Sequence, residues 1–269
     1  MSYEVIALDI DGTLTTTDKR ITERTKKALL DAQRLGKKVI LASGRHDYGI
    51  MPTAKELELD KFGGYIMAFN GGKVINAATG ETVTSVKFPK EYIAPVYDVI
   101  RDSNLTANTY EGNHIVSDKK VNEYTRVEPE ILKMKMVTVD DFPNYIDFDI
   151  NKMLFAGEPE EVQKYEQIIS EKFKGYFDVF RSAPFFLEIM PLGVNKGASL
   201  SAMLPKLGCN REQLIACGDS YNDMTMIGYA GLGVCMENGE KEVKKIADVI
   251  ADSNDNDGVA KIVEQYMLS

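Results

Sequence analysis

Short apolar runs alternate with amphipathic stretches at the start of the chain. Residues 5–8 and 39–42 are near-continuous apolar runs, the pattern of strands buried on both faces of a parallel sheet. Between them, residues 22–35 carry apolar side chains at helical spacing and end at Gly36, a residue type common just after a helix. The order strand, helix, strand predicts a βαβ unit, and with it a doubly wound α/β sheet.

The same alternation continues to about residue 72 and returns after Pro191. It predicts a further helix at residues 51–59 and a strand at residues 65–69. After Pro191 it predicts strands at residues 213–217, 231–236 and 248–250, with helices beginning near residue 196 and covering residues 241–247 and 258–267. We therefore expect the C-terminal part of the chain to complete the sheet begun by the N-terminal part.

The region between these two parts follows another pattern. It predicts hairpins at residues 74–86 and 105–116, helices near residues 90–102 and 160–173, and strands at residues 153–156, 176–181 and 185–190. Such an order is typical of α+β domains. We therefore predict a core formed by residues 1–83 and 191–269, with an α+β domain inserted at residues 84–190.

Composition and charge narrow the choice of partners. The chain has 269 residues, of which 44% are hydrophobic and 27% charged, and its formal net charge is -9 at pH 7. This charge argues against nucleic acid or an anionic membrane as the main partner, because both attract basic surfaces. The three cysteines lack metal-ligand spacing, and no apolar run approaches the roughly 18 residues that span a bilayer. We expect a cytoplasmic protein with free thiols; the pattern does not bear on its oligomeric state.

Polar residues follow the predicted strands of the core or begin a predicted helix. They are Asp9 and Asp11 with Gly12 after the first strand, Ser43, Gly44 and Arg45 after the second, Lys196 at a helix start, and Asp219, Asn222 and Asp223 after a strand of the C-terminal part. Because parallel strands end at one edge of a doubly wound sheet, we expect these side chains to converge there.

The residue types at this edge suit phosphate chemistry. Carboxylates with one amide are the oxygen ligands that Mg²⁺ prefers, and Ser43, its neighbouring backbone N–H groups and Lys196 can bind a phosphate. An aspartate can act as nucleophile in phosphoryl transfer. Taken singly, each residue also has a plainer interpretation as a turn residue or a helix cap. Arg45 is expected to pair with a neighbouring acid, and His46 to lie at the surface.

Four motifs resemble, in order and context, those of the haloacid dehalogenase (HAD) superfamily. They are DxDGTL at residues 9–14, SGR at 43–45, NKG at 195–197 and GDSYND at 218–223. The long insertion between the second and third motifs resembles the large cap of the Cof-type hydrolases, among which sugar-phosphate phosphatases are typical. The resemblance covers the whole chain, and it implies a cap that selects the substrate.

The resemblance also implies roles for the acidic residues. Asp9 would be the nucleophile that forms an aspartyl-phosphate, and Asp11 the general acid/base. Asp9, the backbone carbonyl of Asp11 and Asp219 would hold Mg²⁺, with Asn222 and Asp223 supporting the metal and the phosphate. The two roles in the first motif require different pKa values, so we expect the metal to keep Asp9 ionised and Asp11 to remain protonatable.

Ser43, Gly44 and Lys196 would bind the phosphoryl group in the same family pattern. We therefore expect a Mg²⁺-dependent phosphatase of small phosphate esters, with sugar phosphates as the typical substrates. A phosphomutase or phosphotransferase would use the same residues and differ only in whether the cap excludes water. A non-catalytic sensor of phosphate ligands is the third interpretation. The presence of the acids and of Lys196 argues against it, because a sensor without turnover would not need them.

Overall fold

The structure is a computed structural model that describes residues 2–269, and its chain divides into two compact units. Met1–Thr84 and Asn195–Ser269 form the first unit, called the core here, and Ser85–Val194 form the second, called the insertion unit. The sequence pattern places this division at residues 84 and 190, so the observed return to the core comes a few residues later. No helix among residues 2–269 is long and apolar enough to cross a membrane.

The core is built on one eight-stranded sheet with the strand order β14-β13-β12-β1-β2-β3-β4-β5. From β14 to β3 neighbouring strands are parallel, and β4 runs antiparallel to β3. The strands are β1 (Val5–Leu8), β2 (Lys38–Ala42), β3 (Tyr65–Ala68), β4 (Lys73–Asn76), β5 (Thr82–Ser85), β12 (Leu214–Gly218), β13 (Leu232–Met236) and β14 (Val249–Ala251). The two ends of the chain thus contribute to one sheet, as the sequence predicts.

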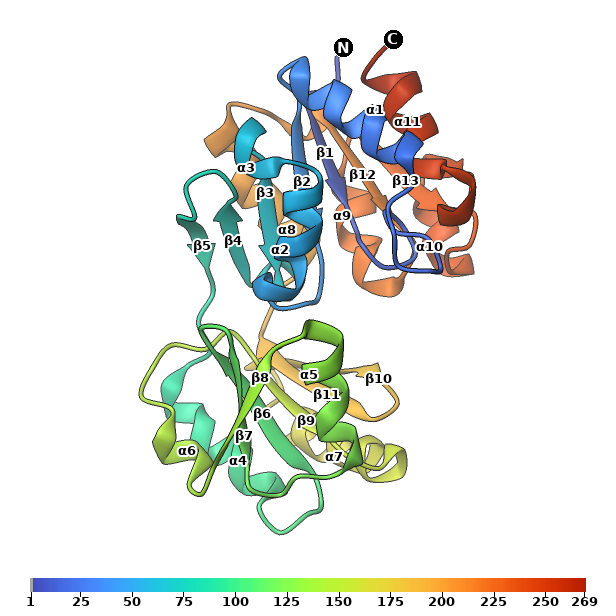
Figure 1. The fold of residues 1–269 in the computed structure, drawn as a ribbon. Helices are drawn as coiled ribbons and strands as arrows, with labels where there is room; N and C mark the ends of the chain where they lie inside the picture. Colours follow the sequence, from blue (N-terminus) through green and yellow to red (C-terminus); the bar gives the residue numbers. More distant parts are fainter. Residues whose placement is uncertain (1) are drawn as a thin grey trace. The chain divides into compact units, whose positions relative to one another are not determined.

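Helices cover both faces of this sheet (Figure 1). The α-helices of the core are α1 (Glu23–Arg34), α2 (Asp47–Glu56), α3 (Leu59–Phe62), α8 (Lys196–Met203), α9 (Met224–Tyr229), α10 (Lys241–Ile246) and α11 (Gly258–Tyr266). Its 3-10 helices are η1 (Phe69–Gly71), η4 (Leu204–Leu207), η5 (Arg211–Gln213), η6 (Tyr221–Asp223) and η7 (Asn254–Asn256). The predicted doubly wound α/β class is confirmed.

Strand β1 lies at the centre of the sheet, between β12 and β2. Its four residues are completely buried, because Val5 and Ala7 pack under α8 and α9 while Ile6 and Leu8 face the opposite layer. A strand buried on both faces must be apolar along its whole length, which is why the sequence shows a continuous run here. The first polar residue, Asp9, therefore marks the end of β1.

The insertion unit has its own six-stranded sheet, ordered β10-β11-β9-β6-β7-β8. Neighbouring strands in this sheet are antiparallel, except for β7 and β8, which are parallel to each other. The strands are β6 (Thr106–Glu111), β7 (His114–Asp118), β8 (Lys135–Val139), β9 (Met153–Ala156), β10 (Phe177–Ala183) and β11 (Phe186–Pro191). The helices are α4 (Ile93–Ile100), α5 (Val127–Leu132), α6 (Phe142–Tyr145) and α7 (Pro159–Lys172), with η2 (Lys90–Tyr92) and η3 (Glu123–Arg126).

Residues 119–150 of this unit contain α5, β8 and α6, for which the sequence pattern gives no signal. Strand β8 lies at the edge of the sheet and pairs only with β7, so most of its residues are exposed or half-buried. An edge strand with little buried surface lacks the apolar run or strict alternation by which strands are recognised. The other elements of the unit lie where the α+β pattern places them.

Candidate active site

Three neighbouring strands of the core end beside one another and present the first, second and fourth motifs. Asp9 follows β1, and its backbone N–H donates to the Cys217 carbonyl of β12 over 3.0 Å. Ser43 follows β2, which pairs with β1 on the other side. The third motif enters through α8, whose first residue is Lys196 and whose N-cap, Asn195, accepts a hydrogen bond from the Ala198 N–H.

Lys196 is the centre of the site. Its side chain is fully buried, and its Nζ donates to Asp9 Oδ1 and to Asp223 Oδ1, each over 2.6 Å. Burial alone would lower the pKa of Lys196, but the charges of the two carboxylates outweigh it and raise that pKa above its usual range. The ammonium therefore stays charged and ties the first motif to the third and fourth.

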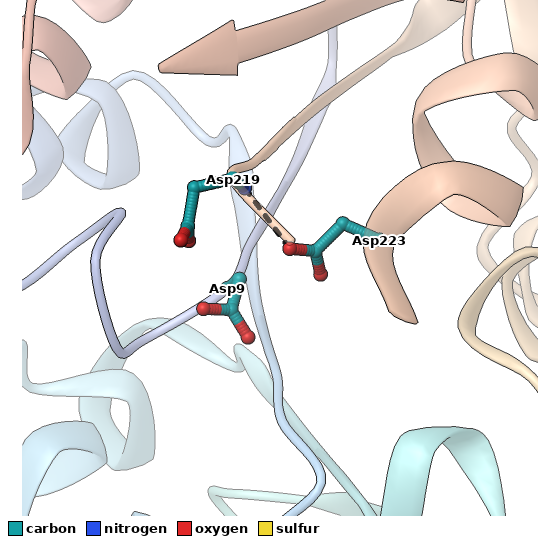
Figure 2. Close-up of side chains that lie close together, drawn as sticks. All are labelled: Asp9, Asp219 and Asp223. Atoms are coloured by element: carbon teal, nitrogen blue, oxygen red, sulfur yellow. Dashed lines mark hydrogen bonds between the residues drawn. The ribbon is translucent and has the colours of Figure 1, made fainter. Parts of the chain in front are cut away.

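Three carboxylates, those of Asp9, Asp219 and Asp223, lie close together, as Figure 2 shows. Asp9, Asp219 and Asp223 each offer an oxygen, and these oxygens lie within 4.8 Å of one another. The loop after β12 is held by Asp223 Oδ2, which accepts the backbone N–H groups of Asp219 and Ser220 over 3.0 Å each. The Thr13 hydroxyl donates to Asp219 Oδ1 over 2.7 Å and so fixes the orientation of the Asp219 carboxylate.

Burial makes the ionised forms of Asp9 and Asp219 less favourable than in water. Burial raises the pKa of Asp9 to about 8, although the charge of Lys196 acts in the opposite direction. Burial also raises the pKa of Asp219 to about 6, against the hydrogen bond from Thr13. One lysine does not neutralise three acids, so the donor set fits a hard divalent cation with oxygen ligands.

Two acids of this cluster differ in what they can still bind. Both oxygens of Asp223 are engaged, one by Lys196 and the other by two backbone N–H groups. Asp219 uses only Oδ1, toward Thr13, and its Oδ2 lies beside Gly12, where a Cβ would come within 2.6 Å of it. Gly12 also has a φ of +81°, which favours glycine. The turn after Asp11 therefore requires glycine both for its backbone conformation and for the close approach of Asp219.

The carboxylate of Asp11 lies outside this cluster. Its Oδ1 accepts hydrogen bonds from Lys19 over 2.8 Å and from Arg45 over 2.7 Å. Partial burial would raise the pKa of Asp11, but the two cations outweigh it and hold that pKa below its usual range. In the structure, therefore, the pKa of Asp9 is raised and that of Asp11 lowered, the reverse of the expected order. Arg45 pairs with an acid, as the sequence suggests.

The second motif and Asn222 form the other side of the site. Ser43 is buried, and its Oγ accepts the backbone N–H of Arg45 over 3.2 Å. Asn222 lies in η6 and donates through Nδ2 to Asn70 Oδ1 over 3.0 Å. Asn70 and Thr13 were not among the predicted site residues. Asn70 lies two residues after the end of β3, so the strand-end argument used for the other tips would have found it.

The expectation that His46 is a surface residue is wrong. It is 6% exposed and forms the N-cap of α2, where its Nδ1 accepts the backbone N–H of Tyr48 over 3.0 Å. Its ring packs edge-on against Phe69, with 5.2 Å between the ring centroids. His46 is buried because its ring caps α2 and packs against Phe69, and neither contact can be inferred from the polar residues beside it in the sequence.

We predict that Lys196→Met destabilises the protein, because it leaves Asp9 and Asp223 buried without their counter-charge. Breaking a buried ion pair by removing one partner typically costs about 3–5 kcal/mol. Thermal unfolding with and without Mg²⁺ measures the effect, and a cation bound at the cluster should restore part of the loss. Lys241→Met, at an exposed lysine of α10, is the control. Equal melting temperatures for the two variants would contradict the central position of Lys196.

A family model described as haloacid dehalogenase-like hydrolase matches residues 6–263. The chain belongs to this family. The match covers nearly the whole chain, and its range includes the residues of all four motifs. The geometry above agrees with it, because the three strand tips and the α8 start that carry these motifs meet at one end of the core sheet.

Relatives of the same length are similar along the whole chain. A provisionally named phosphatase of Streptococcus pyogenes serotype M6 is 33% identical over 273 residues, covering 100% of both chains. The 5-amino-6-(5-phospho-D-ribitylamino)uracil phosphatase of Bacillus subtilis is 31% identical over 270 residues, covering 100% of this chain and 97% of its own. A solved haloacid dehalogenase-like hydrolase from Bacteroides thetaiotaomicron has a TM-score of 0.93 and 40% identity over 98% of this chain and 99% of its own.

Family and relatives agree on the type of enzyme. The chain is a HAD-type phosphatase, as the sequence predicted, and its fold, including the inserted α+β unit, is that of HAD-like hydrolases. Within residues 2–269, Asp9, Asp219 and Asp223 form a group of acids whose arrangement could hold a metal ion.

Proposed function

We propose that this phosphatase hydrolyses phosphate esters of sugars and related polyols with the help of Mg²⁺, by way of a phosphoryl group carried on Asp9. The observation that supports it most is the position of Lys196, which binds Asp9 and Asp223 at once inside a cluster of three acids. A buried ammonium that orients a carboxylate through one oxygen leaves the other oxygen for attack. The Bacillus subtilis relative whose name gives a phosphorylated ribityl group as substrate supports the polyol part of the proposal.

In the first step, Asp9 Oδ2 attacks phosphorus while Oδ1 remains bound to Lys196. The bond between phosphorus and the ester oxygen breaks, and the departing alkoxide takes a proton from Asp11. In the second step Asp11, now ionised, takes a proton from water, and that water attacks phosphorus and releases Asp9. The pairs with Lys19 and Arg45 favour the ionised form of Asp11, which the second step requires, and they oppose the protonated form that donates in the first step.

Asp9, Asp219 and the backbone carbonyl of Asp11 are the groups we propose to hold Mg²⁺. Asp223 is better suited to support, since Lys196 and two backbone N–H groups already engage its oxygens. The bound ion would neutralise charge on the phosphoryl oxygens, which phosphoryl transfer requires more than covalent assistance. Ser43, Gly44 and Asn222 are proposed to bind the phosphoryl group through N–H, hydroxyl and amide donors.

We predict that activity falls to background in a chelator and returns when Mg²⁺ is added. Without a divalent cation, Asp9, Asp219 and the phosphate dianion repel one another at short range. Asp219→Asn should raise the Mg²⁺ concentration needed for half-maximal rate, because it removes a charged ligand and leaves the nucleophile in place. Initial rates over a Mg²⁺ titration measure both effects. Full turnover in excess chelator would contradict the assignment of the metal.

The insertion unit contains a buried group of polar side chains whose types suit hydroxyl-rich substrates. One face of its sheet packs under α4 and α7 through Ala107, Phe155 and Leu187. On the opposite face Asn108 and Glu188 lie in one cross-strand row, and Lys152 contacts Glu188 over 3.1 Å. Carboxylate, amide and ammonium groups are the ones that hydrogen-bond to sugar hydroxyls. We therefore propose that this unit selects the substrate, as a cap.

We predict that excising the insertion unit leaves a folded core with slow and unselective activity. The catalytic acids and Lys196 all belong to the core, and apart from Ser85 at the end of β5 its sheet contains no residue of the insertion unit. A short Gly-Ser linker from Thr84 to Asn195 makes the variant, circular dichroism checks its fold, and hydrolysis of an aryl phosphate is compared with that of sugar phosphates. If the excised core kept the substrate ranking of the intact enzyme, the insertion unit would not be the selector.

The proposed function is tested by measuring phosphate release from panels of sugar phosphates, polyol phosphates, nucleotides and cofactor phosphates in Mg²⁺. The proposal expects the highest kcat/KM among sugar or polyol phosphates. A preference for nucleotides would contradict it. Release of phosphate only when a second sugar is present, with transfer to that sugar, would identify a phosphotransferase or phosphomutase that uses the same residues.

A further inference from the structure

Asn70 has an unusual place beside the site. It lies in η1, directly after β3, with φ 53° and ψ 31°, a left-handed conformation that residues other than glycine adopt only occasionally. It is 8% exposed, and its backbone N–H donates to the Ser43 carbonyl over 2.9 Å. The tip of β3 is thereby tied to the tip of β2, where the second motif begins.

The side chain of Asn70 contacts two other parts of the site. Its Oδ1 accepts the hydrogen bond from Asn222 Nδ2 over 3.0 Å. Its amide also lies against Gly44, because a Cβ at Gly44 would come within 3.2 Å of Oδ1 and 3.3 Å of Nδ2. Gly44 does not have a positive φ, so an added Cβ there would crowd the Asn70 amide and would not strain the backbone.

The turn that carries Asn70 is itself fixed on the third motif. A Cβ at Gly71 would lie 2.8 Å from the Asn195 carbonyl and 2.7 Å from Ser199 Cβ, so the turn sits directly on the start of α8. That helix start holds Lys196. Asn70 thus lies where the second, third and fourth motifs meet, although it belongs to none of them.

We propose that Asn70 is a positioning residue for phosphate binding. Its side chain sets the orientation of the Asn222 carboxamide and the distance between the Ser43–Gly44 loop and that carboxamide. This inference rests on the proposed function, in which Ser43, Gly44 and Asn222 bind the phosphoryl group. An asparagine retained only for its left-handed backbone would be replaceable by glycine without loss, because glycine adopts that conformation freely. A positioning residue would not be replaceable in this way.

The first test compares Asn70→Gly, Asn222→Ala and the double variant. Removing a binding interaction that is equal in the ground and transition states raises KM and leaves kcat nearly unchanged. We expect Asn70→Gly to raise KM for 4-nitrophenyl phosphate and the inhibition constant of inorganic phosphate by about tenfold each. Because Asn70 acts in part through Asn222, the loss of phosphate binding in the double variant should be smaller than the sum of the two single losses. Additive losses, or unchanged phosphate binding in Asn70→Gly, would overturn the proposal.

The second test uses the contact with Gly44. Gly44→Ala adds a methyl group against the Asn70 amide and should weaken phosphate binding in the wild-type background. In the Asn70→Gly background the same substitution meets no amide, so it should cause little further loss. An equal loss in both backgrounds would show that Gly44 and Asn70 do not act on each other, and would contradict the proposal.

A control and a reference separate the possible failures. Glu58→Gly also replaces a residue with a left-handed backbone, φ 55°, in the core, and it should leave phosphate binding unchanged. If the wild-type enzyme neither binds inorganic phosphate nor hydrolyses 4-nitrophenyl phosphate, the proposed function fails. If the wild type does both and Asn70→Gly matches it, only the inference about Asn70 fails.

Discussion

Asp9→Asn is expected to abolish turnover at every Mg²⁺ concentration. The amide keeps the shape of the side chain but lacks the nucleophilic oxygen, and removal of a nucleophile typically lowers kcat by about 10⁶-fold. The Lys196 ammonium remains beside the substituted residue and still pairs with Asp223, so the fold should persist. Steady-state rates with 4-nitrophenyl phosphate and with the best sugar phosphate measure the loss.

A matched control and a contrasting variant make this result specific. Asp18→Asn removes an exposed acid from the same N-terminal region and should not change the rate. Asp219→Asn should recover activity as Mg²⁺ is raised, whereas Asp9→Asn should not. Turnover by Asp9→Asn that rises with Mg²⁺ would mean that Asp9 serves only as a ligand and that water attacks the ester directly.

Asp11→Asn is expected to slow the reaction to a degree that depends on the leaving group. General acid/base catalysis typically contributes about 10²–10⁴-fold in rate. A sugar alkoxide departs poorly without a proton, while 4-nitrophenolate departs well unaided. The first chemical step should therefore slow much more for a sugar phosphate than for the nitrophenyl ester, which rapid-mixing measurements of both substrates can show.

The second step should suffer with either substrate, because the attacking water loses its base. With 4-nitrophenyl phosphate, Asp11→Asn should release a burst of nitrophenol close to one equivalent per enzyme, followed by slow release of phosphate. Equal slowing of the first step for both esters, without a burst, would show that Asp11 serves the fold or the metal and not proton transfer.

The position of the candidate site at one edge of the core sheet was predictable from sequence because it follows from backbone geometry. Once residues 5–8 form a strand buried on both faces, Asp9 marks its end, and a parallel neighbour must place Ser43 on the same side. The doubly wound class follows from the same apolar runs. These features depend on local pattern and strand order, and both can be read along the chain.

The charged partners of the acids were not predictable in this way. They depend on how side chains that are far apart in the sequence are placed in the fold. Asp11 pairs with Lys19 and Arg45, and these pairs reverse the expected order of the Asp9 and Asp11 pKa values. Asp223 lies inside the acid cluster because its carboxylate accepts the N–H groups of its own loop. A sequence motif names such residues but does not show which of their oxygens remain available.

The central claim is that Asp9 carries the phosphoryl group, and the Asp11→Asn variant allows it to be tested directly. The variant is mixed with 4-nitrophenyl phosphate, quenched in acid during the slow phase and digested, and its peptides are analysed by mass spectrometry. The account predicts one phosphoryl group on the peptide that contains Asp9, and none when Asp9→Asn is added to Asp11→Asn. A phosphoryl group on any other residue, or an unmodified Asp9 peptide at the end of a full burst, would contradict it.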